Sequence, residues 1–163
     1  MIHSELSLRL ARLRDADKIA AMSRVLIEYG LTWRWTATRV EASIRAANVN
    51  VLVARLNGRI VGFAIMRYGD DDAHLDLLAV APAYQRRGIA RQLLRWLEEC
   101  AVVAGIFKIE LEVRANNNGA RLFYERMGYH NLVQLPGYYQ GKESAQRMAR
   151  DLSCKSPDQS SQS

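Results

Sequence analysis

Cysteine and long apolar runs are scarce in this chain, and each shortage excludes a class of protein. Two cysteines, Cys100 and Cys154, are too few for a disulfide scaffold or for a zinc site with three or four thiolates. No run of about 18 or more apolar residues occurs, so we expect no membrane-spanning helix. The first residues lack the basic-then-apolar order of a signal peptide. The sequence therefore predicts a cytoplasmic protein that holds no metal and does not associate with a membrane.

The rest of the composition is that of an ordinary globular protein. Apolar residues make up 49% of the chain and charged residues 25%. A length of 163 residues suits one domain, which we expect over residues 1–152. The last residues, 153–163, are rich in serine and glutamine and predict a disordered tail.

Basic residues outnumber acidic ones by 23 to 17, which gives a net charge of +6. Such a surplus suits nucleic acid, an acidic surface or a polyanionic small ligand. The basic residues are spread along the chain and no nucleic-acid motif occurs, so we expect no nucleic-acid partner. One dense group, made of Arg86, Arg87, Arg91 and Arg95, favours a small polyanion instead.

The apolar periodicity interleaves strands and helices. Strands are predicted over residues 6–13, 50–56, 60–67, 74–80, 107–114, 129–135 and 144–152. Helices are predicted over residues 19–29, 38–47, 88–104 and 116–127. Asn57-Gly58 is a strong signal for a hairpin turn. This order predicts an α/β fold, with a mixed sheet and helices on both of its faces.

The most informative segment spans residues 78–90, where a buried strand ends and a helix starts at a glycine. The first turn of a helix carries unpaired backbone N–H groups and the positive end of the helix dipole, and both favour a phosphate. Gly88 lets the backbone approach such a ligand, since a side chain there would take its place. Arg86 and Arg87 add charge beside the anion.

Other phosphate-binding loops are excluded by the residues present. A Walker loop needs Gly-Lys followed by Ser or Thr, which this segment lacks. A dinucleotide fingerprint needs three glycines where Gly88 stands alone. The plainer alternative is a helix start that uses glycine for packing, but the preceding strand, Pro82 and the later segment together favour pyrophosphate.

Two blocks of residues resemble the GNAT superfamily of acyl-CoA N-acyltransferases. The first joins Leu77-Leu78-Ala79-Val80-Ala81-Pro82 to Gln85-Arg86-Arg87-Gly88-Ile89-Ala90, which fits that family's Q/R-x-x-G-x-G/A loop. The second joins Leu111-Glu112-Val113-Arg114-Ala115-Asn116-Asn117-Asn118 to Ala120-Arg121-Leu122-Phe123-Tyr124-Glu125-Arg126-Met127-Gly128-Tyr129. Together with Gly137-Tyr138-Tyr139 and Glu143-Ser144-Ala145, the second block is most similar to bacterial ribosomal-protein N-terminal acetyltransferases.

The resemblance implies a fold and a cosubstrate. The fold is a mixed, mostly antiparallel sheet of about six or seven strands, with a splayed parallel pair at its centre and helices on both faces. The cosubstrate is acetyl-CoA, with pantetheine bonded to the end of a central strand and pyrophosphate on the N–H groups that follow. The cofactor-binding residues implied are Leu78, Ala79, Val80, Gln85, Arg86, Arg87, Gly88, Ile89, Ala90, Arg91, Asn117 and Tyr124.

The reaction implied is direct transfer of an acetyl group from the thioester to a primary amine. Tyr124 is the expected general acid, although a tyrosine at helical spacing also suits a packing role. A base must take a proton from the amine. Glu112 matches the Glu of the family's Glu-Val-Arg, unless it merely pairs with Arg114 or Lys108. The alternative base is His74, which shares one face of its strand with Asp76, since a histidine has a pKa near ~6.5; water is the third alternative.

The acceptor side is less defined. Trp33, Tyr138 and Tyr139 are expected to flank the acceptor, with core packing as the alternative for the tryptophan. The acceptor is a protein N-terminus or a small amine. A non-catalytic acyl-CoA-binding module on the same fold is the alternative function, and the retention of Tyr124 and Glu112 argues against it. A homodimer is left open.

Overall fold

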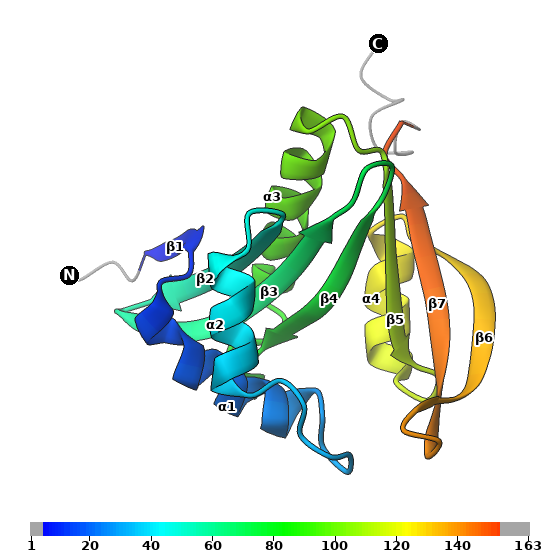
Figure 1. Cartoon of the computed structure of the whole chain (residues 1–163), viewed down its shortest axis with the longest axis horizontal. Coiled ribbons are helices and arrows are strands. Elements are labelled where there is room, and N and C mark those ends of the chain that lie inside the picture. The colour runs from blue at the N-terminus through cyan, green and yellow to red at the C-terminus, as the bar shows by residue number, and fades with distance from the viewer. Residues whose placement is uncertain (1–4, 154–163) are drawn as a thin grey trace. The chain divides into compact units, whose positions relative to one another are not determined.

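A computed structural model describes residues 5–153 of the chain (Figure 1). Strands and helices alternate, with two short 3₁₀ turns. In chain order the elements are β1 (Leu6–Leu10), η1 (Leu13–Asp15), α1 (Ala16–Leu26), α2 (Ala37–Arg45), β2 (Val49–Leu56), β3 (Arg59–Tyr68), β4 (Ala73–Val80), η2 (Pro82–Tyr84), α3 (Ile89–Val103), β5 (Lys108–Arg114), α4 (Asn118–Arg126), β6 (His130–Tyr139) and β7 (Glu143–Asp151). No helix in this part of the chain is long and apolar enough to cross a membrane.

The strands of the described residues form a mixed sheet in the order β1-β2-β3-β4-β5-β7-β6. Strands β4 and β5 are parallel and the others antiparallel. The chain divides into two compact units, the first comprising Met1–Arg67 and Leu75–Leu97 and the second Tyr68–His74 and Glu98–Ser163. The expected α/β class and the mostly antiparallel sheet are therefore confirmed.

The first unit is built on an antiparallel meander whose apolar residues alternate. Strand β2 pairs with β1 on one side and with β3 on the other. Because side chains alternate between the faces of a strand, one face carries Val53, Phe63 and Ile65. Helices α1 and α2 lie over this face (Figure 1), and their Ile19 and Val40 are fully buried in the same cluster. Burial contributes about 1.5–3 kcal/mol for each such side chain, which holds the helices on the sheet.

The opposite face of these strands packs against the start of α3. A Cβ at Gly62 on β3 would lie 3.4 Å from Leu93 of α3 and 3.1 Å from the Ala79 carbonyl oxygen. Glycine at this position therefore allows β4 and α3 to approach β3 closely. Helices thus cover both faces of the meander, as the sequence predicts.

The second unit is built on β5, β7 and β6, with β7 paired antiparallel to both neighbours. A buried polar group stabilises it. The Tyr129 hydroxyl donates to Oε2 of Glu98 at 2.9 Å, and Nη1 of Arg150 lies 3.0 Å from both Glu98 oxygens. Because Glu98 is buried, loss of either partner would leave its carboxylate under-paired. Burial first, and then the Glu98 charge, raises the pKa of Tyr129 well above its ordinary value.

The predicted elements match the observed ones, except near the start of the chain and at the end of β6, which runs to Tyr139 although the sequence predicts its end at residue 135. The strand expected over residues 6–13 ends at Leu10 and is followed by η1. The helix expected to reach residue 29 ends at Leu26, and Val25 and Tyr29 are 67% and 51% exposed. A single domain over residues 1–152 stays a prediction. The expected tail lies outside the described residues, apart from Ser153.

Candidate active site

The turn between β4 and α3, in the first unit, has the backbone conformation of an anion-binding loop. Arg86 and Gly88 have positive φ values of 64° and 79°. A Cβ at Gly88 would meet nothing within 4 Å, so open space lies beside it. The side-chain amide of Gln85 donates to the Val80 carbonyl oxygen at 3.0 Å and so braces the turn. The predicted pantetheine contacts Leu78, Ala79 and Val80 are the last three residues of β4.

Six consecutive backbone N–H groups in this turn have no acceptor within residues 5–153; they belong to Arg86, Arg87, Gly88, Ile89, Ala90 and Arg91. The next N–H group, of Gln92, donates to the Gly88 carbonyl oxygen at 3.1 Å. The helix dipole adds about half a positive charge at this end of α3. Unpaired N–H groups around residues of positive φ form a concavity that binds anions. The backbone therefore offers a site for phosphate or pyrophosphate.

Arginine side chains reinforce this site. Arg86, Arg87, Arg91 and Arg95 are exposed, and the first turn of α3 contains no acidic residue. Within the described part of the chain, none of the four forms an ion pair. Their positive charges are therefore available to a bound anion.

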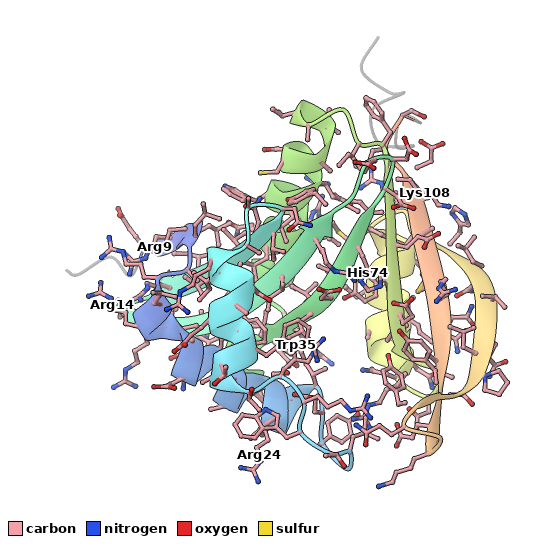
Figure 2. All side chains as sticks on the ribbon, in the orientation of Figure 1. Arg9, Arg14, Arg24, Trp35, His74 and Lys108 are labelled. Atoms are coloured by element: carbon pink, nitrogen blue, oxygen red, sulfur yellow. The ribbon has the colours of Figure 1, made fainter. Side chains whose placement is uncertain are left out.

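The two alternative bases, His74 and Glu112, form one pair in the second unit. His74 stands at the start of β4 (Figure 2), and its Nε2 lies 2.5 Å from Oε2 of Glu112 on β5. This hydrogen bond fixes which ring nitrogen faces the carboxylate. The His74 side chain is 29% exposed and that of Glu112 only 7%. The imidazole is therefore the member of the pair that a substrate can reach.

Arg147 completes the group. Its Nε donates to Oε1 of Glu112 at 3.0 Å, because residues 112 and 147 are opposite each other on β5 and β7. Burial raises the pKa of Glu112, but the hydrogen bond and charge of His74, followed by those of Arg147, lower it below its ordinary value overall. Glu112 is therefore a fixed carboxylate that orients the imidazole.

The partners suggested for Glu112 by the sequence are wrong. Lys108 pairs instead with Glu110 at 3.0 Å, and Arg114 pairs with Glu143 at 2.8 Å. The sequence pattern also misses Arg147. Its position opposite Glu112 follows from the register of β5 and β7, and no local pattern encodes that register.

Tyr124 lies in α4, and its ring is packed between two others. The rings of Phe123 and Tyr129 make edge contacts with it, at centroid distances of 5.1 and 5.7 Å. Burial, and then the neighbouring Tyr139, raises the pKa of Tyr124 well above its ordinary value, so the phenol stays protonated at neutral pH. Its hydroxyl makes no hydrogen bond within the described residues. The hydroxyl is therefore protonated and has a donor to offer, although burial also makes it a weaker acid than an ordinary tyrosine.

Tyr138 and Tyr139 stand at the end of β6, in the same unit as His74 and Glu112. Their rings are 5.0 Å apart, and Tyr138 is exposed. Burial raises the pKa of Tyr139, and the charges of Tyr138 and Glu112 raise it further. The guanidinium of Arg114 lies 6.0 Å from the Tyr139 ring. The tyrosines expected on the acceptor side are therefore electrostatic neighbours of the histidine–carboxylate pair.

The other predicted ligand contacts also have structural partners. Trp33 packs against the buried cluster beneath α1 and α2, and Arg24 lies 5.1 Å from its ring centroid. Oδ1 of Asn117 accepts the Ala120 backbone N–H at 3.1 Å and caps α4. Contact of either residue with a ligand stays a prediction.

A carboxylate that the sequence does not single out orders the loop after α1. Glu28 is buried, and its Oε2 accepts the Ser23 hydroxyl at 2.9 Å. Its Oε1 accepts the backbone N–H groups of Arg34 and Trp35, at 2.7 and 3.2 Å. One side chain thus fixes the segment that carries both tryptophans of this loop.

An open mixed sheet with an anion-binding helix start after β4 fits an acyltransferase of the coenzyme A-dependent class. The sequence matches the Acetyltransferase (GNAT) family over residues 12–129, and the chain belongs to this family. It is therefore an acetyl-CoA-dependent N-acetyltransferase. Within the described residues, no three His, Cys, Asp or Glu side chains are grouped so as to hold a metal ion.

Known relatives agree in sequence and in fold. The ribosomal protein bS18-alanine N-acetyltransferase of Escherichia coli (strain K12) is 38% identical over 100 residues, which cover 60% of this chain and 68% of that protein. The crystal structure of the ribosomal-protein-S18-alanine N-acetyltransferase from Escherichia coli has a TM-score of 0.78 at 27% identity and covers 94% of this chain and 98% of that one. The PaiA N-acetyltransferase of Thermoplasma acidophilum in complex with coenzyme A has a TM-score of 0.75 at 17% identity, covering 90% and 99%.

Proposed function

We propose that this enzyme acetylates the α-amino group at the N-terminus of a protein. The name of the Escherichia coli relative specifies an alanine of a ribosomal protein as its acceptor. Alanine has no side-chain amine, so its N-acetylation takes place on the backbone nitrogen. At 38% identity, the relative supports the same class of acceptor for this chain.

The observation that carries this proposal is the pair formed by His74 and Glu112. An amine attacks only in its neutral form, and the pKa is about 8 for an α-amine and about 10.4 for lysine. At neutral pH the neutral fraction of an α-amine is therefore roughly two hundredfold larger. A histidine that is oriented by a carboxylate is a base matched to the α-amine.

Each catalytic residue then has one task. His74 accepts a proton from the attacking amine, directly or through water, and Glu112 stabilises the imidazolium that forms. The Val80 backbone N–H donates to the carbonyl oxygen as negative charge develops there. Tyr124 donates its proton to the departing sulfur. A C–N bond replaces the C–S bond of the thioester that acetyl-CoA supplies, and the proton gained by His74 balances the one given up by Tyr124.

The N–H groups of residues 86–91 hold the pyrophosphate of acetyl-CoA in this proposal, and the pantetheine bonds to backbone groups of Leu78 and Val80. Asn117 adds a further contact to the cosubstrate. Tyr138, Tyr139 and Trp33 flank the acceptor. The activity belongs in the cytoplasm, where acetyl-CoA and protein acceptors are both present.

A non-catalytic acyl-CoA-binding module is the weaker proposal. Such a module needs the anion-binding turn but has no use for the pair of His74 and Glu112, nor for the unused donor of Tyr124. Both features serve proton transfer, which binding alone does not require.

The test compares two peptides of matched sequence in the presence of acetyl-CoA. One has a free N-terminal alanine and no lysine, and the other has a blocked N-terminus and one internal lysine. A thiol-detecting dye follows turnover, and mass spectrometry locates the acetyl group. We expect transfer to the free alanine alone. Transfer to the lysine alone, or no release of thiol with either peptide, would overturn the proposal.

A further inference from the structure

Four arginines that are scattered along the sequence meet near the start of α1. Arg9 stands on β1, Arg12 and Arg14 at η1, and Arg55 on β2. Figure 2 shows Arg9 and Arg14 at the same edge of the first unit. The acidic residue Asp15 lies among them and pairs with Arg55 at 2.6 Å. The group therefore has three more positive charges than negative ones.

The register of the first two strands explains this meeting. Arg9 is opposite Val53, and Ser7 is opposite Arg55. Arg9 and Arg55 are therefore diagonal neighbours on one face of the sheet. Val53 belongs to the cluster beneath α1, so this is the face on which α1 begins.

The carboxylate of Asp15 does not neutralise the other three arginines, because both of its oxygens already have partners. Its Oδ1 contacts Arg55, and its Oδ2 accepts the backbone N–H of Arg12 at 2.8 Å. Asp15 is 4% exposed, so both oxygens are committed inside the protein. The side chains of Arg9 and Arg14 make no hydrogen bond or ion pair within residues 5–153.

Two buried donors in the same group also need an acceptor. Nε of Arg9 and Nε of Arg55 are buried without a hydrogen-bond partner in the described part of the chain. Such donors are unfavourable unless an acceptor is supplied. Partial desolvation, and then the charges of Arg55 and Arg12, lower the pKa of Arg9, while Asp15 opposes them. An added anion would relieve this repulsion between the guanidinium groups.

The net charge of the whole first unit also favours an anionic ligand. Its segments hold fifteen Lys and Arg against six Asp and Glu, whereas the second unit holds eight against eleven. Four of the fifteen are the arginines around the turn at residues 86–91. Eleven basic residues remain against the same six acidic ones, so the surplus is larger than the cosubstrate site requires.

We propose that Arg9, Arg12 and Arg14 bind a phosphate group, either free or in the backbone of single-stranded RNA. Guanidinium groups match phosphate oxygens through paired, charge-assisted hydrogen bonds. Asp15 holds Arg55 at the base of this site, which shares no residue with the turn at residues 86–91. Folding thus brings these arginines together on one surface, although they are not all adjacent in the sequence.

The test uses the full chain with coenzyme A at saturation, so that the turn at residues 86–91 is blocked. Fluorescence anisotropy measures binding of a labelled short oligouridylate at several salt concentrations, and thermal melting measures stabilisation by inorganic phosphate. The variant Arg9→Gln/Arg14→Gln is compared with Arg126→Gln/Lys142→Gln, which removes the same charge from exposed positions of the second unit. Arg14→Glu, at an exposed position, repeats the test if the double variant does not fold.

We expect the variant at Arg9 and Arg14 to bind the oligonucleotide about tenfold more weakly than the control. Its salt dependence should be shallower by about 0.7 for each phosphate that the variant no longer neutralises. That result supports RNA as the source of the phosphate. If binding of the oligonucleotide is equal but inorganic phosphate stabilises only the control, the ligand is free phosphate. Equal behaviour of both variants in both measurements overturns the proposal.

Discussion

Nε2 of His74 and Oε2 of Glu112 are 2.5 Å apart, so the two residues that compete for the role of base in the sequence act as one unit. Removing Glu112 takes away the carboxylate that orients the imidazole and the one that pairs with Arg147. Removing His74 leaves Arg147 to balance a buried carboxylate by itself within this group. Substituting either residue also disturbs the other, so a single variant does not measure the contribution of one residue to catalysis.

A double-mutant cycle measures this coupling. We expect His74→Gln and Glu112→Gln each to lower kcat by about a hundredfold, the usual contribution of a positioned base. The double variant should lose less than about tenfold more, because either substitution already disables the pair. Steady-state turnover with a saturating acceptor peptide provides the measurement. If the fold-reduction of kcat in the double variant equals the product of the two single reductions, the two residues act independently.

Gly88 offers a second prediction, because Gly105 is a matched control. Both glycines have φ near 79° and 78°, and a Cβ at either would meet nothing within 4 Å. Gly88→Asp and Gly105→Asp therefore introduce similar backbone strain and the same charge. Calorimetry should show acetyl-CoA affinity falling by at least about tenfold, or 1.4 kcal/mol, for Gly88→Asp alone. Equal affinities in the two variants would remove the anion site from this turn.

The parts of the site that the sequence predicts well are local. Gly88, the preceding strand and the following helix are neighbours along the chain, so their order alone indicates the anion-binding turn. The boundaries of β2, β3 and α4 follow in the same way from alternation, the Asn57-Gly58 turn and the cap at Asn117. Periodicity is a local property, and these elements obey it.

The parts that the sequence does not predict depend on pairing or on buried polar groups. Arg147 reaches Glu112 through strand register across 35 positions. At the end of α1 the Ser23 carbonyl oxygen accepts the N–H groups of both Ile27 and Glu28, and the buried Ser23 hydroxyl donates to Oε2 of Glu28 at 2.9 Å. The spacing of apolar residues alone predicts a helix that continues to Tyr29. That spacing takes no account of the hydrogen bonds of a buried serine.

Tyr124 and Tyr129 allow a third prediction to separate catalysis from stability. Tyr124 has an unused hydroxyl, whereas the Tyr129 hydroxyl donates to the buried Glu98. We expect Tyr124→Phe to lower kcat by about tenfold to a hundredfold, with little change in acetyl-CoA affinity or in stability. Tyr129→Phe should instead lower the free energy of unfolding by about 1–3 kcal/mol. Turnover assays and urea unfolding of both variants test this, and an unchanged rate in Tyr124→Phe would exclude it from the chemistry.

The lowered pKa of Glu112 predicts a specific loss of stability in acid. The folded pKa lies below the ordinary value of 4.5, so the charged form is favoured by folding. Its contribution is complete above about pH 4.5 and disappears as the pH falls through the folded pKa. Urea unfolding near neutral pH and near pH 3.5 should therefore show a larger acid effect in the wild type than in Glu112→Gln. Equal effects would mean that His74 and Arg147 do not stabilise the carboxylate.

Glu28 supports a prediction about the loop that carries Trp33 and Trp35. Glu28→Ala removes the acceptor for the Ser23 hydroxyl and for two backbone N–H groups. Because a buried donor without a partner costs about 1–3 kcal/mol, we expect the free energy of unfolding to fall by at least about 2 kcal/mol. Glu28→Gln keeps one acceptor oxygen and should be less destabilised. The exposed control Glu125→Ala should change stability by under about 0.5 kcal/mol, and a similarly small effect in Glu28→Ala would assign the loop's order to tryptophan packing instead.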